Sequence, residues 1–170
     1  MAASVIAVFG TLLGALVTHR QQLKSARLTA VMAREERVRQ DRLDVYAAYG
    51  GALMDYRRCL MDHWYAEREG RHEEDLIALR RASFEQRAAA QEAMFRVELL
   101  TTGSALIDAG RQALTGVTGL RSAETTEAFD EARAVSRRAI YAFITASKDH
   151  LDLASERRER LPAPPHEGGL

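Results

Sequence analysis

The chain has 170 residues, of which 46% are hydrophobic and 28% are charged, a balance that permits a packed core and argues against global disorder. Equal numbers of basic and acidic residues give a formal net charge of +0, which argues against a dedicated nucleic-acid-binding protein. The only cysteine, Cys59, excludes an intrachain disulfide and suits a reducing compartment.

The composition favours helix. All three prolines lie after residue 161, so the preceding chain lacks the strongest helix breaker. Ala, Leu, Arg and Glu are abundant and β-branched residues are sparse, which also favours helix over strand. We therefore predict an all-α fold.

Residues 2–18 carry no charged side chain and predict an N-terminal transmembrane helix. As a helix this run rises ~25 Å, at the short end of what crosses a bilayer. A secretory signal peptide is the main alternative, but no basic side chain precedes the run and no small-residue cleavage site follows it. A buried core helix or an interfacial helix is the other alternative.

Flanking charge gives this segment a direction. No Lys or Arg precedes it, whereas Arg20, Lys24 and Arg27 follow it closely. Basic flanks remain on the cytoplasmic side of a membrane. The predicted localisation is therefore the inner (plasma) membrane, single-pass, with the N-terminus outside and the C-terminal domain in the cytoplasm.

The same segment contains small residues on one helical face. Gly10 and Gly14 form a GxxxG pair, which Ala7 and Thr18 extend. Small residues let two transmembrane helices approach closely, so this face predicts self-association into a homo-oligomer. The alternative is that these are only small residues on a lipid-facing helix.

A long helix is expected to follow, as a stalk over residues 19–44 that leads into a bundle over residues 45–160. Apolar or small residues recur every seven positions at Val31, Val38, Val45, Ala52 and Cys59, with Leu28, Tyr49, Tyr56 and His63 on a neighbouring register. Glu35 and Arg42 interrupt this pattern, which is typical of a solvated stalk or a coiled coil. Residues 161–170 are predicted to be a disordered tail.

Glycines and capping residues divide the remaining chain into helices. Gly50 and Gly51 are expected to bend the first helix without ending it, and Gly70 reads as its C-cap. A second helix is predicted over residues 73–100, and a third over 105–114. The third is expected to end at Gly116 and Gly119.

A fourth helix is expected to run to about residue 160. Ser122 is its predicted cap, with Glu124 and Glu127 in its first turn. The connections are short, so neighbouring helices should run antiparallel in a three- or four-helix bundle. The predicted core face of the second helix is Leu76, Leu79, Phe84, Ala88, Phe95 and Leu99, and that of the fourth is Phe129, Ala132, Ile140, Phe143 and Leu151.

Three local patterns contain residue types that bind partners, act as nucleophiles or ligate metals. Trp64, the only tryptophan, is a candidate partner contact, although packing in the bundle is the ordinary interpretation. Cys59 and His63 lie one helical turn apart, as a thiol–base pair requires, but no oxyanion site or orienting carboxylate accompanies them. Glu69 and His72 match Glu-x-x-His once, without the second copy that a di-iron bundle needs. We predict no enzyme activity, no metal and no cofactor.

The layout resembles that of uncharacterised actinobacterial single-pass membrane proteins, with an uncharged GxxxG segment before an Arg-rich helix and a bundle. The stretch that carries this resemblance is Arg42-Leu-Asp-Val-Tyr46-Ala-Ala-Tyr49. It implies no known activity. A looser similarity is to the inner-membrane spanin subunits of phage lysis systems, whose helix lies in the periplasm. The basic flank here argues against that topology.

The function predicted from these patterns is a membrane-anchored interaction or scaffold module that self-associates and presents a cytoplasmic bundle to a protein partner. An envelope-disrupting or phage-lysis-type effector is the first alternative. An enzyme with a metal in the bundle core is the second.

Overall fold

The computed structural model describes the backbone of residues 2–159 and the side chains of residue 22 and residues 25–153. In that part of the chain every regular element is helical, which confirms the all-α prediction. The elements are α1 (Ala2–Arg68), α2 (Glu73–Leu100), α3 (Ser104–Thr118), the 3₁₀ helix η1 (Gly119–Ser122) and α4 (Thr126–Glu159).

Two compact units make up the chain, Met1–Asp41 and Arg42–Leu170. In the first unit, helical backbone begins at Ala2, and its large apolar side chains from Leu28 onward are exposed. Val31 is 56% exposed and Val38 is 43% exposed, so no neighbouring helix covers this register among the described residues. The coiled-coil prediction for this stretch is therefore not supported.

No helix within the described part of the chain is long and apolar enough to cross a membrane. This finding contradicts the predicted single-pass localisation, with the N-terminus outside and the domain in the cytoplasm. From residue 25 onward α1 carries charged side chains along its whole length, such as Arg27, Arg34 and Arg37, and charge is costly in a hydrocarbon core. The uncharged run of residues 2–18, on which the prediction depended, lies outside the residues whose side chains the structure describes.

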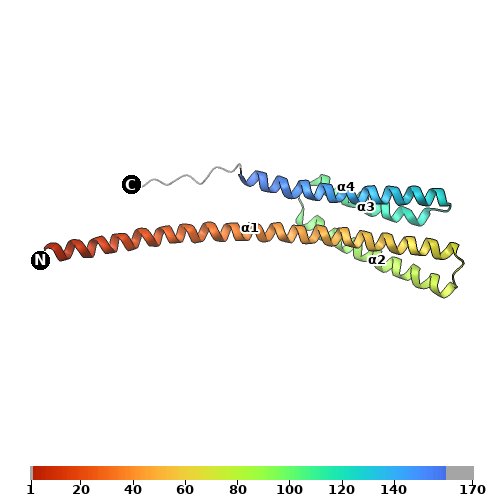
Figure 1. The fold of residues 1–170 in the computed structure, drawn as a ribbon, viewed down its shortest axis with the longest axis horizontal. Helices are drawn as coiled ribbons and strands as arrows, with labels where there is room; N and C mark the ends of the chain where they lie inside the picture. Colours follow the sequence, from red (N-terminus) through yellow and green to blue (C-terminus); the bar gives the residue numbers. More distant parts are fainter. Residues whose placement is uncertain (1, 160–170) are drawn as a thin grey trace. The chain divides into compact units, whose positions relative to one another are not determined.

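The second unit is a bundle of the C-terminal part of α1 with α2, α3 and α4. Figure 1 shows the chain reversing direction at each connection between these helices, so successive helices run antiparallel. Packed antiparallel helices confirm the predicted bundle. The predicted borders at residues 18, 44 and 160 stay predictions.

Aromatic side chains from α1 and α4 dominate the bundle core. Tyr49 and Phe143 meet edge to face, with ring centroids 4.9 Å apart, and both are almost fully buried. The core also includes Leu53 and Tyr56 of α1, Met94 and Val97 of α2, Leu106 and Val117 of α3, Leu120 of η1, and Phe129 and Ile140 of α4. The predicted core face of α4 is confirmed.

Packing within the second unit explains the seven-residue repeat of α1. From Tyr49 onward the register faces the other helices of the bundle, where Tyr49 is 0% exposed and Tyr56 is 1% exposed. The seven-residue repeat therefore follows the side of α1 that packs inside its own chain. α1 passes through Gly50 and Gly51 without interruption, as predicted.

Gly70 ends α1 as the sequence predicts. Its φ of +66° is the left-handed conformation that glycine adopts without steric cost. The amide of Arg71 donates to the carbonyl oxygen of Ala66 at 3.1 Å, and the amide of Gly70 donates to the carbonyl oxygen of Glu67 at 3.3 Å. These two bonds form a Schellman motif, which satisfies the last carbonyls of the helix.

The segment between α3 and α4 differs from the prediction. α3 continues through Gly116 to Thr118, and Ser122 lies in η1 instead of capping α4. Thr125 is the cap, since its Oγ1 accepts the amide of Ala128 at 3.2 Å. The residues that the sequence suggested as a loop and a helix cap form one turn of 3₁₀ helix instead. Leu120 in this turn is 1% exposed and packs in the core, which accounts for the difference.

Candidate functional site

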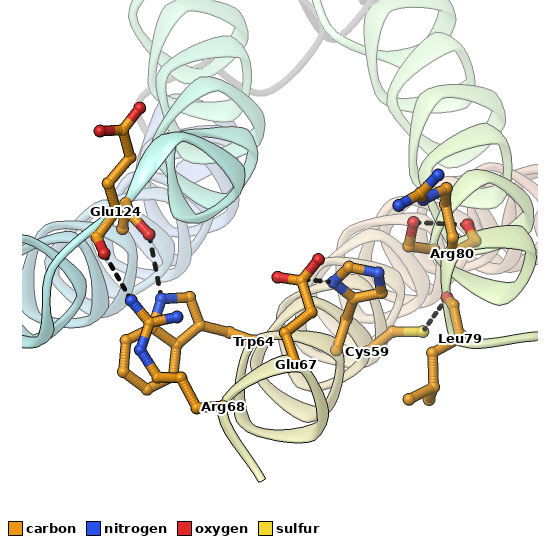
Figure 2. Close-up of polar contacts among 10 residues, drawn as sticks. Cys59, Trp64, Glu67, Arg68, Leu79, Arg80 and Glu124 are labelled. Atoms are coloured by element: carbon orange, nitrogen blue, oxygen red, sulfur yellow. Dashed lines mark hydrogen bonds and ion pairs between the residues drawn. The ribbon is translucent and has the colours of Figure 1, made fainter. Parts of the chain in front are cut away.

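Trp64 lies in the last turns of α1, where the bundle covers most of its ring. The indole stacks on Phe129 of α4 with centroids 3.8 Å apart and an interplanar angle of 6°. Its Nε1 donates to the carbonyl oxygen of Ala123 at 3.0 Å, and the guanidinium of Arg68 lies 3.5 Å from the centre of the ring. Figure 2 shows Trp64 and Arg68 side by side, with contacts reaching the segment that contains Glu124.

This packing leaves little of the Trp64 side chain exposed to a partner. The residue is 7% exposed, and its two ring faces are occupied by Phe129 and by Arg68. The role of Trp64 as a partner contact stays a prediction. Its observed role is to join α1 to α4 and to the turn before α4.

His63 precedes Trp64 and lines a cleft of about 430 Å³. Its Nδ1 faces a carboxylate oxygen of Glu67 at 3.6 Å. Its Nε2 is shielded from solvent and has no hydrogen-bond partner in the part of the chain that the structure describes. A buried imidazole nitrogen without a partner is costly.

We call this cavity the His63 cleft. It is formed by Leu60, His63, Trp64 and Glu67 of α1, by Arg80, Ser83 and Phe84 of α2, and by Leu120, Arg121 and Ala123 at η1. Three segments that are distant in sequence therefore meet there. Figure 2 shows Glu67 on α1 and Arg80 on α2.

Positive charge predominates in the His63 cleft. Neither Arg80 nor Arg121 forms an ion pair with a carboxylate among the described residues. The guanidinium of Arg121 lies over the ring of Phe84, 5.1 Å from its centroid. Glu67 is the acidic residue of the lining. The cleft thus presents two guanidinium groups and one imidazole against one carboxylate.

Cys59 contacts α2 through its thiol. Its thiol donates to the carbonyl oxygen of Leu79 with an S–O distance of 3.9 Å, which Figure 2 shows on the α2 side. Burial, and after it the negative charge of Asp62, raise the pKa of the Cys59 thiol. A thiol held in its protonated form is a poor nucleophile, so the geometry favours a packing role.

α2 presents its largest apolar side chains away from the core. Its inward residues are Ser83, Ala90, Met94 and Val97. By contrast Phe84 is 50%, Phe95 is 62% and Leu99 is 85% exposed. The predicted core face of α2 is therefore wrong for Phe84, Ala88, Phe95 and Leu99, because another side of the helix, with Ser83, Ala90, Met94 and Val97, faces the core.

We call Ile77, Phe84, Ala88, Phe95 and Leu99 the α2 outer face. They recur at intervals of seven, four, seven and four residues, the spacing of a helix-packing seam. Ion pairs lie beside it, Arg81 with Glu85 at 3.2 Å and Arg96 with Glu92 at 2.7 Å. An apolar centre with a charged rim is the usual anatomy of a protein interface.

The remaining predicted site residues are not brought to either surface. The side chains of Ala7, Gly10, Gly14 and Thr18, and those of Arg20 and Lys24, lie outside the described residues. Arg27 is exposed in the first unit. Self-association through the N-terminal segment and its basic flank stay predictions. The Glu69 carboxylate pairs with Arg71 at 3.1 Å, and no cluster of metal-ligating side chains occurs among the described residues.

Sequence reasoning missed Arg80 and Arg121 as cleft residues. Neither stands out in the sequence, since arginine is frequent along the whole chain. Only the cluster His63-Trp64-Tyr65 gave a signal near the cleft. For the α2 outer face the signal was present, but it was assigned to the core.

One family model matches the chain, over residues 43–151, and is described as KilB plasmid transfer protein. The match covers more than half of the chain and nearly the whole bundle, so the chain belongs to the KilB plasmid transfer protein family. No curated protein and no solved structure matches.

Proposed function

We propose that this KilB-family chain is a helical interaction module of a plasmid transfer apparatus, and that its α2 outer face binds a helix of a protein partner. The family description supplies the process. The observation that carries the proposal is the placement of Phe95 and Leu99, which are 62% and 85% exposed while small residues of α2 face the core.

The spacing of the α2 outer face indicates the kind of partner. Ile77 and Leu99 are separated by six helical turns, about 33 Å along the axis. Side chains at seven- and four-residue intervals form a straight ridge that packs into the groove of another helix. Ala88 stands near the middle, where a small side chain permits close approach of the two backbones. An amphipathic partner helix fits this surface.

The charged residues beside the ridge constrain the charge pattern of the partner helix. Arg81 and Glu85 flank one half of the ridge, and Glu92 and Arg96 flank the other. Both signs of charge are present on each half, so the partner helix should carry mixed charge beside its apolar side. Exposed rim charges set orientation and association rate more than affinity.

The test replaces Phe95 and Leu99 together by glutamate, which places charge on the two most exposed aromatic and aliphatic side chains of the proposed interface, in its C-terminal half. Plasmid transfer frequency is measured in a host whose only KilB-family chain is the variant. We expect a loss of at least about tenfold, equivalent to about 1.4 kcal/mol of binding free energy. Circular dichroism should show unchanged helix content, because both side chains are exposed.

Tyr141→Glu is the matched control. Tyr141 is 61% exposed on α4, close to the exposure of Phe95, and lies on a different helix. Its transfer frequency should equal that of the unaltered chain. Transfer that is unchanged in the Phe95→Glu, Leu99→Glu variant would overturn the proposal. A dimer that this variant converts to monomer in light scattering would assign the surface to a second copy instead.

A further inference from the structure

We propose that the His63 cleft is a binding site for a small phosphomonoester, a role distinct from partner binding by the α2 outer face, with which the cleft shares Phe84. Arg80 of α2 and Arg121 of η1 line the cleft together with His63 of α1, so three segments bring two arginines to one cavity. Neither arginine is in an ion pair with a carboxylate within the described residues.

The donor set favours a phosphate group. Arginine is the side chain best suited to phosphate because its planar guanidinium donates two parallel hydrogen bonds to neighbouring oxygens. A phosphomonoester carries close to two negative charges on three terminal oxygens, whereas a carboxylate carries one on two, so a pair of guanidinium groups matches the phosphate better. His63 lines the cleft, but its Nε2 is shielded from solvent and does not serve as a donor to the ligand.

The apolar residues that line the cleft indicate that the ligand has an organic part. A cavity of about 430 Å³ is within the size range of small-molecule sites and is larger than one phosphate ion requires. Leu60 and Leu120 are buried at its base, and Phe84 is half exposed at its edge. The ring of Trp64 is already occupied on both faces, so an organic group would contact the aliphatic walls and Phe84.

The only tryptophan of the chain lines this cleft, which makes its fluorescence a direct reporter. The full chain is titrated with phenyl phosphate, inorganic phosphate and benzoate, and binding is also measured by calorimetry. We expect saturable one-to-one binding of phenyl phosphate, at least about tenfold tighter than inorganic phosphate, which lacks a group for the apolar walls, and than benzoate, whose carboxylate has one negative charge and two oxygens for the arginines.

Arg121→Gln and Arg80→Gln should each weaken phenyl phosphate binding at least about tenfold. Arg81→Gln is the matched control, since Arg81 neighbours Arg80 but pairs with Glu85 outside the cleft lining. Its binding should be unchanged, and thermal denaturation checks that every variant folds.

Three outcomes would overturn the proposal. The first is no saturable binding of phenyl phosphate to the unaltered chain. The second is an equal loss in Arg81→Gln, which would show only general attraction to positive charge. The third is equal affinity for inorganic phosphate or for benzoate, which would remove the phosphomonoester as the ligand class. None of these outcomes bears on plasmid transfer through Phe95 and Leu99.

Discussion

Replacing Phe129 by alanine is expected to lower the free energy of unfolding by about 3–5 kcal/mol. Phe129 is 1% exposed, so the truncation leaves a cavity between α1 and α4. It also removes the ring that stacks on Trp64 at 3.8 Å and the edge contact with Tyr65 at 5.5 Å. Such aromatic pairs contribute about 0.5–1.5 kcal/mol beyond the buried area.

Urea denaturation followed by circular dichroism and by tryptophan emission measures this loss. Because Trp64 is the only tryptophan and stacks on Phe129, its emission should shift to longer wavelength in the folded variant. Tyr141→Ala is the control: Tyr141 is 61% exposed, and its loss should change stability by no more than about 0.5 kcal/mol. A loss below about 1 kcal/mol for Phe129→Ala would contradict the packing described for Trp64.

Replacing Tyr49 by phenylalanine is expected to cost about 1–2 kcal/mol of stability. The hydroxyl of Tyr49 donates to the carbonyl oxygen of Gly110 at 2.7 Å and joins α1 to α3 in the core. Burial, and secondarily the charge of Glu98, raise the pKa of Tyr49, so the hydroxyl stays protonated and remains a donor at neutral pH.

Close approach at Gly110 makes this bond specific. A Cβ added there would lie 2.8 Å from Sδ of Met94, so glycine lets α3 come near both α1 and α2. Tyr56→Phe is a matched comparison because Tyr56 is also buried, at 1% exposure, but its hydroxyl has no partner among the described residues. Removing that hydroxyl should be neutral or stabilising. Equal thermal destabilisation of the two variants would contradict a specific role for the Tyr49 bond.

Local signals in the sequence were enough to predict the course of the helices. The second helix was expected over residues 73–100, and α2 has the same limits, because Gly70 and residues 101–104 terminate helices by short-range conformational preference. The capping of α4 was less predictable, since Ser122 and Thr125 are both good caps. Which one is used depends on the burial of Leu120, a tertiary effect.

The orientation of α2 could not be predicted from its own sequence. The helix has two apolar sides, a narrow one with Ala90 and Val97 and a bulky one with Phe84 and Phe95. Burial of apolar area favours placing the bulky side inward in an isolated chain. The opposite arrangement is observed because the space beside α2 is filled by side chains from the other helices, information that lies outside residues 73–100.

The His63 cleft was unpredictable for a related reason. Arg80 and Arg121 are 41 positions apart in the sequence and come together only when α2 and η1 pack on α1. The sequence did single out His63 and Trp64. It indicated no ligand for His63, and for Trp64 it indicated either a partner contact or packing in the bundle. The spanin-like alternative stays an untested prediction.

Site-specific photocrosslinking tests most directly whether the α2 outer face binds a helix of a transfer protein. A photoreactive residue replaces Leu99, which is 85% exposed, and in a separate chain replaces Tyr141, which is 61% exposed. Both are illuminated in cells during plasmid transfer, and adducts are identified by mass spectrometry. The proposal predicts an adduct with a protein of the transfer apparatus from position 99 and none from position 141. No adduct at position 99, equal adducts at both positions, or an adduct only with a second copy of this chain would contradict it.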